Sequence, residues 1–146
     1  MQTFERDGIS FRYPADWTAE VADDAESGGW TVTVSAPRGV DAFFMASLQP
    51  DAADGGDVAD QTLAALKSDY KEFDAEDVME TICGQPAVGF NADFLTADTA
   101  VICRVRGMDT FAGPLMLLVQ VSVLDLAECD PVLLAIVKSL DVETDR

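Results

Sequence analysis

The chain has 146 residues, of which 27 are acidic and 9 are basic, so its formal net charge at pH 7 is −18. This excess of carboxylates argues against binding to nucleic acid, which requires basic side chains that neutralise phosphates, and against binding to anionic membrane surfaces. The sequence contains no histidine, which excludes Ser-His-Asp and Cys-His catalysis and histidine-based zinc sites. Hydrophobic residues make up 49% of the chain. This content argues against disorder, and the length predicts a single domain over residues 1–146.

The first third of the chain predicts four strands. Apolar and polar side chains alternate over residues 8–13, 17–21 and 30–35, as expected for strands, whose side chains point alternately to two faces. The acidic segment 23–29 carries two glycines and predicts a hairpin loop. Residues 42–48 are apolar on both faces, which predicts a more buried strand.

A helix is predicted over residues 57–71, ending before Asp74. Asp57 can accept hydrogen bonds from the free amides of the first turn, and the negative charge of Asp60 suits the same turn. Four apolar side chains then recur at helical spacing along one stripe: Leu63, Leu66, Tyr70 and Phe73.

Three further strands are predicted over residues 77–83, 86–95 and 99–106, joined by tight turns. The last of them separates its side chains into two sets, because alternate residues of a strand face opposite sides. One face carries Val101, Cys103 and Val105, and the other carries Ile102, Arg104 and Arg106.

The segment 115–140 predicts a central strand followed by a terminal helix. Residues 115–124 are apolar on almost every position of both faces, which predicts a strand inside a sheet that is covered on both sides. Asp130 is the expected cap and Pro131 the expected first residue of the helix. The order of elements predicts an α+β fold, in which helices pack on a twisted antiparallel sheet.

The three cysteines form no CxxC pair, which predicts reduced thiols and a cytoplasmic location. The first residues also lack the basic and apolar segments of a secretion signal. Cys103 alternates with apolar residues and is expected in the core, whereas Cys83 precedes a tight turn. Cys129 is the best nucleophile candidate, because a helix N-terminus can lower the pKa of a thiol. The chain offers no histidine to activate it.

The segment 51–60, DAADGGDVAD, contains four aspartates spaced by three residues: Asp51, Asp54, Asp57 and Asp60. Acidic loops of this kind can bind Ca²⁺ or Mg²⁺. An EF-hand loop, however, places ligands at every second position and ends with a glutamate, and this segment does neither. The favoured interpretation is a helix cap without an ion. Calorimetry with Ca²⁺ on the chain and on Asp54→Asn distinguishes the two.

A hydrolase or isomerase that uses carboxylates is an alternative function. Asp93, Asp98 and Asp109 could lie near one another and supply an acid and a base, but nothing in their spacing brings them together. No catalytic residue, metal ligand or cofactor is therefore assigned from the sequence.

Trp17 and Trp30 lie on strands that expose one face, and both are expected to be core residues. The alternative is that one of them is exposed beside Phe43 or Phe44. In that position it would form a binding hot spot for a partner.

Four short segments resemble the Mog1/PsbP-like superfamily, which includes the DcrB and DUF1795-type small bacterial proteins. They are the start SFRYPADW at residues 10–17, the helix at 57–71, the turn ICGQPAVGF at 82–90 and the terminal helix ending in IVKSL at 136–140. The resemblance implies an α/β/α sandwich around an antiparallel sheet. It implies no catalytic motif, and the metal sites of photosystem relatives use histidine, which this chain lacks.

Members of this superfamily are mostly non-enzymatic: a Ran-GTPase cofactor, photosystem II assembly subunits and chaperones of secreted effectors. The resemblance therefore implies an accessory or chaperone-like domain whose partner is another protein. The alternatives are a protein that binds a divalent ion or small ligand, and a carboxylate-based hydrolase or isomerase. We expect no binding to nucleic acid and no insertion into a membrane.

The acidic composition allows two interpretations. The first is an ordinary soluble surface whose charges repel one another. The second is adaptation to a salt-rich habitat, where many aspartates and few lysines keep a protein hydrated. Melting temperatures measured from dilute buffer to molar KCl decide between them, since only the second interpretation predicts a steep rise.

Overall fold

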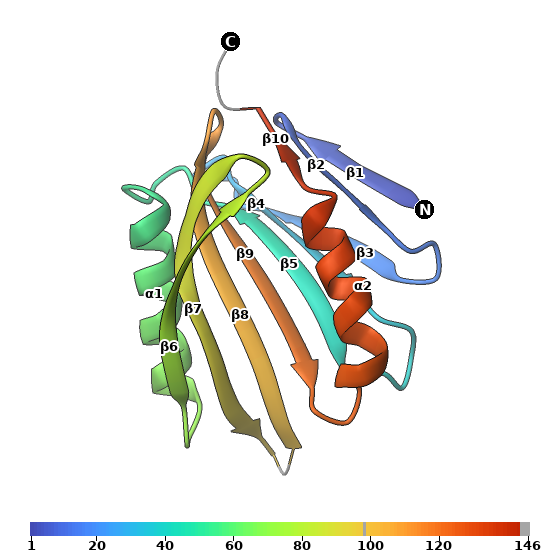
Figure 1. Cartoon of the computed structure of the whole chain (residues 1–146). Coiled ribbons are helices and arrows are strands. Elements are labelled where there is room, and N and C mark those ends of the chain that lie inside the picture. The colour runs from blue at the N-terminus through green and yellow to red at the C-terminus, as the bar shows by residue number, and fades with distance from the viewer. Residues whose placement is uncertain (98, 144–146) are drawn as a thin grey trace.

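The computed structural model describes residues 1–97 and 99–143. Its main element is a seven-stranded antiparallel sheet with the strand order β3-β4-β5-β9-β8-β7-β6 (Figure 1). The strands are β3 (Thr18–Asp23), β4 (Trp30–Ser35), β5 (Ala42–Leu48), β6 (Asp74–Ile82), β7 (Gln85–Thr96), β8 (Thr99–Thr110) and β9 (Gly113–Ser122).

Strand β9 is the middle strand of the sheet, as the sequence predicts. Leu115 and Leu117 belong to the apolar core on one face of the sheet, and Met116 and Leu118 belong to the core on the other face. A strand that is apolar on both sides is stable in this position because both of its faces are covered.

One helix lies on each face of the sheet, and together they form an α/β/α arrangement (Figure 1). Helix α1 (Gly55–Asp69) packs on β7, β8 and β9, whereas α2 (Leu126–Lys138) packs on β5 and β9 from the other side. A second, three-stranded sheet also contacts α2 through its middle strand. It consists of β1 (Gln2–Arg6), β2 (Ile9–Tyr13) and β10 (Asp141–Val142). The predicted α+β class is therefore confirmed.

Helix α1 begins at Gly55, two residues earlier than the sequence predicts, and its cap lies three residues earlier. Its N-cap is Asp54, whose carboxylate accepts a hydrogen bond of 2.8 Å from the main-chain N–H of Asp57. Asp57, the predicted cap, lies in the first turn, and its side chain accepts a hydrogen bond from the N–H of Ala53. The arrangement resembles a capping box, except that Asp57 binds the amide of Ala53, the residue before the cap, and not that of the cap itself.

Helix α2 also begins earlier than predicted, so the assignment of Asp130 and Pro131 to its start is wrong. The helix begins at Leu126 after Asp125, and Pro131 lies inside it. Proline removes one helical hydrogen bond at that point. The helix continues because buried apolar side chains recur on both sides of the proline: Cys129, Leu133 and Ile136.

Strands β1 and β10 have no counterpart in the prediction, and β6 begins at Asp74 and not at residue 77. These segments carry polar and exposed side chains, so they lack the apolar alternation from which strands are predicted. Within residues 1–97 and 99–143, no helix has the length and apolar character needed to cross a membrane.

The two helices cover different halves of the sheet. Helix α1 lies over the β7–β9 half on its side, and α2 with the small sheet lies nearer the β4–β5 half on the other side (Figure 1). The α2-side face of β6 and β7 consequently carries exposed side chains, among them Asp74, Glu76 and Asp93.

Candidate binding surface

The aspartates of the segment 51–60 are used in different ways. Asp54 and Asp57 bind main-chain amides at the start of α1, and Asp57 also accepts a hydrogen bond from Gln61. Asp51 and Asp60 are exposed. Among the described residues, no group of three or more acidic or cysteine side chains is arranged to hold a metal ion. Two of the four aspartates that the sequence offers as ion ligands, Asp54 and Asp57, thus serve the helix start.

Asp93 and Asp109, two of the three carboxylates considered as a catalytic set, lie far apart in the structure. Asp109 accepts a hydrogen bond of 3.0 Å from the N–H of Gly55, at the start of α1. Asp93 lies opposite Ile102 in the ladder, and Ile102 precedes Asp109 by seven residues on the same strand. At about 3.3 Å per residue this separation is roughly 23 Å. Asp98 lies outside the described residues.

All three cysteines lie within the described residues and are free thiols. Cys103 is fully buried, and burial raises its pKa to about 12. Cys129 is buried as well; burial raises its pKa, and the charges of Asp125 and Glu128 raise it further. A raised pKa reduces the thiolate form. The position of Cys129 therefore does not activate it, contrary to the prediction from a helix N-terminus.

We expect Cys83 alone to react with a maleimide in the folded protein, because it is exposed whereas Cys103 and Cys129 are buried. Buried thiols react only after the protein unfolds locally, so Cys103 and Cys129 should be labelled at least about a hundredfold more slowly than Cys83. The pKa of Cys83 is raised by partial burial and by Asp141, so its labelling should accelerate with rising pH. Mass spectrometry of labelled protein, with and without concentrated urea, measures both effects. Rapid labelling of Cys129 without urea would contradict the expectation.

Both tryptophans are core residues, as predicted. Trp17 and Trp30 are 7% and 2% exposed, and the Nε1–H of Trp30 donates a hydrogen bond of 2.8 Å to Asp7. Phe44 is fully buried beside Phe11. The alternative prediction of an exposed tryptophan hot spot is therefore wrong.

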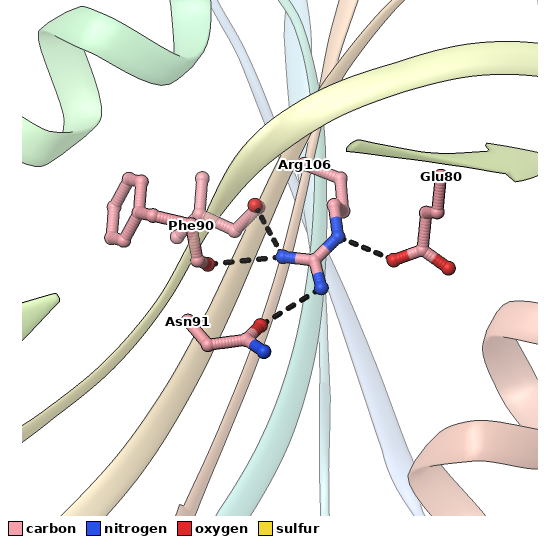
Figure 2. A network of polar contacts seen from close by, with 5 residues as sticks. Glu80, Phe90, Asn91 and Arg106 are labelled. Atoms are coloured by element: carbon pink, nitrogen blue, oxygen red, sulfur yellow. Dashed lines mark hydrogen bonds and ion pairs between the residues drawn. The ribbon is translucent and has the colours of Figure 1, made fainter. Parts of the chain in front are cut away.

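Arg106 on β8 joins three neighbouring strands on the α2 side of the sheet (Figure 2). Its Nε donates to the carboxylate of Glu80 on β6, and its Nη2 donates to Oδ1 of Asn91 on β7. Its Nη1 donates to the main-chain oxygens of Phe90 and Val105. The arginine residue is 7% exposed, so this network is part of the folded framework.

Arg104 lies two residues earlier on the same strand, and it binds helix α2 and not a neighbouring strand. Its Nη1 donates to Oδ1 of Asp130 on α2 at 2.7 Å, and both side chains are 26% exposed. The predicted placement of Arg104 and Arg106 on one face is confirmed. Each arginine is bound to a carboxylate of the chain, so neither offers an unpaired positive charge.

The exposed half of the sheet is hollowed at the end where β6 begins and β7 ends. This end of the two strands is at the bottom of Figure 1. Two adjoining hollows of about 660 and 380 Å³ share Asp74, Asp93 and Ile102. We name their union the basal groove. Its lining also includes Glu76, Asn91, Leu95, Ala100 and Val123.

The sequence contains a weak signal for the basal groove. Asp74 and Glu76 alternate at the start of β6, as Asn91 and Asp93 do on β7. Residues that alternate share one face of a strand, but segment 74–76 lies between the predicted helix and the strand predicted from residue 77. The pairing of the two strands, which places these side chains together, is known only from the structure.

No model of a protein family matches the chain, and no curated protein matches it. Solved structures do match over most of its length. The protein of unknown function PA94 from Pseudomonas aeruginosa has a TM-score of 0.62 and 14% identity, over 99% of each chain. The cyanobacterial PsbP of Synechocystis, CyanoP, has a TM-score of 0.59 and 15% identity, over 97% of this chain and 91% of CyanoP.

A third similar structure is LpqN of Mycobacterium tuberculosis, a protein involved in cell envelope biogenesis. Its TM-score is 0.54 at 13% identity, over 92% of this chain and 83% of LpqN. The chain therefore has the Mog1/PsbP-like fold that the sequence resemblance implies. Similarity at these sequence identities shows the fold alone.

Proposed function

We propose that the chain is a non-enzymatic accessory domain that binds another protein through the exposed β6–β8 half of its sheet. The observation that carries this proposal is the basal groove, a hollowed surface on a sheet face that otherwise packs against α2. Hollows of several hundred cubic ångströms are a common form of binding site. Of the side chains considered for chemistry, Asp54, Asp57 and Asp109 bind main-chain amides at or beside the start of α1, and Cys103 and Cys129 are buried.

Charge and thiols support the rest of the proposal. A net charge of −18 disfavours nucleic acid as the partner, because phosphates would be repelled. The cysteines are unpaired thiols, which suits the reducing environment of the cytoplasm. Two of the similar structures are, by their names, a cyanobacterial PsbP and a protein involved in cell envelope biogenesis.

Site-specific photo-crosslinking in the native host tests the proposed surface. The crosslinking amino acid is placed at Ile102 in the basal groove, and in a matched variant at Thr33, which lies half-buried on the opposite side of the sheet. We expect one discrete protein adduct from position 102 and none from position 33. An adduct from position 33 alone, or from neither position, would contradict binding through the β6–β8 half.

A further inference from the structure

The polar part of the basal groove holds carboxylates that the chain does not neutralise. Asp74 and Asp93 lie directly opposite each other in the β6–β7 ladder, and Glu76 lies opposite Asn91. Side chains that are directly opposite in an antiparallel pair have Cβ atoms about 4.5–5.5 Å apart, so two like charges there are destabilising. In the described part of the chain, no ion pair or hydrogen bond engages the side chains of Asp74, Glu76 or Asp93.

The nearest cations of the same sheet face cannot relieve this repulsion. Arg104 is held by Asp130 on α2, and Arg106 is held by Glu80 together with Asn91. Asp74, Glu76 and Asp93 therefore remain as an unpaired negative site in the groove. A positive group that enters the groove from outside would gain their attraction and would remove the cost of placing Asp74 beside Asp93.

The other part of the groove is apolar and open. Leu95 and Val123 line it and are 39% and 44% exposed, respectively. Ala100 lies opposite Leu95 in the β7–β8 ladder and Ile102 lies opposite Asp93. Leu124, the residue after Val123, is 83% exposed. Contiguous exposed apolar side chains next to polar ones are typical of protein-binding surfaces.

We infer that the basal groove binds a segment of a partner protein that places a lysine or arginine beside a large apolar side chain. The inference rests on the proposed function and adds the chemistry of the partner. The basic group lies between Asp74, Glu76 and Asp93, and the apolar side chain contacts Leu95 and Val123. The two hollows share Asp93 and Ile102. Adjacent residues of one partner segment therefore reach both the acidic and the apolar part of the groove.

A peptide-display selection on the intact chain tests this inference. Random peptides of about a dozen residues are selected in buffer near physiological salt, where distant surface charges are largely screened. We expect the recovered peptides to be enriched in a lysine or arginine next to leucine, methionine, phenylalanine or tryptophan. Fluorescence anisotropy then gives the affinity of the best peptide for the chain and its variants.

The diagnostic variant is Asp74→Asn/Asp93→Asn, and its matched control is Asp16→Asn/Glu20→Gln. Both variants remove two negative charges from exposed residues. The control lies away from the groove, because β3, to which Glu20 belongs, forms the opposite edge of the sheet. We expect the groove variant to weaken binding by at least about tenfold and the control by less than about twofold. Relief of the like-charge pair should leave the melting temperature of the groove variant equal to or above that of the unchanged chain.

The outcomes separate the inference from the proposed function. Peptides without basic residues that lose affinity on Ile102→Ala would overturn the inference and leave groove binding intact. Peptides that are insensitive to both Ile102→Ala and the groove variant, or a selection that recovers none, would overturn both. A dimer in solution that the groove variant dissociates would assign the groove to a second copy of the chain and would likewise overturn the inference.

Discussion

Replacing Gly107 by alanine is expected to lower the free energy of unfolding by about 3 kcal/mol, and the melting temperature by roughly 6–12 °C. Gly107 on β8 lies against Gly55, the first residue of α1. A Cβ atom on Gly107 would lie 2.8 Å from the carbonyl carbon of Gly55 and 3.3 Å from its Cα. Both partners are main chain, so no side chain can rotate away, and the helix start must move.

The helix start is not free to move, because several contacts fix it to the sheet. The N–H of Gly55 donates to Asp109 at the end of β8, and Val58 in the next turn is fully buried. A shift of α1 would stretch the first contact and open space around the second. The cost of the extra methyl group is therefore expected at the upper end of the range for overpacked cores.

Gly56→Ala is the matched control, because its Cβ would meet only Oδ1 of Asp54 at 3.3 Å and Cγ2 of Val88 at 3.9 Å. Alanine also favours the helix over glycine by up to about 1 kcal/mol. The expected change in stability is therefore within about 1 kcal/mol of zero. Urea unfolding followed by tryptophan fluorescence measures all variants. Equal effects of Gly107→Ala and Gly56→Ala would refute the close approach of α1 and β8.

The same contact explains why the cap of α1 was predicted three residues late. Asp51, Asp54, Asp57 and Asp60 are all suitable N-cap residues, so local preference does not choose among them. The choice is made by packing, because only a start at Gly55 presents a residue without a side chain to Gly107. A tertiary contact thus decides a boundary that the local sequence leaves open.

Elements with strong apolar periodicity were predicted well. Strands β4 and β5 have the predicted bounds, and β9 occupies the predicted central position. Strands β1 and β10 escaped prediction because they lie at the edges of the small sheet and bury little. Periodicity reports burial, so it identifies the interior of a sheet more readily than its edges.

The candidate surface was less predictable than the fold, for a physical reason. The sequence does place Arg104 and Arg106 on one face of a strand. Their partners, however, come from β6, β7 and α2, up to 26 residues away in the chain. Which carboxylate meets which arginine depends on strand register and on the twist of the sheet, and neither can be read from a single sequence.

Arg106→Met is expected to reduce the free energy of unfolding by about 3–5 kcal/mol. The substitution leaves four acceptors without their donor: the carboxylate of Glu80, the side-chain oxygen of Asn91 and the carbonyl oxygens of Phe90 and Val105. Each buried acceptor that loses its hydrogen bond costs about 1–3 kcal/mol. Glu80 contributes least, because 44% of its side chain is exposed and water can replace the arginine.

Arg104→Met is the matched control, since it removes the same group from the same face of β8. The Arg104–Asp130 pair is partly exposed on both sides, and such pairs contribute about 1 kcal/mol or less. Urea unfolding should therefore separate the two variants by at least about 2 kcal/mol. Equal stabilities would mean that water satisfies the acceptors around Arg106. The arginine would then not hold β6 against β7 and β8, and the acidic side of the basal groove would lack this support.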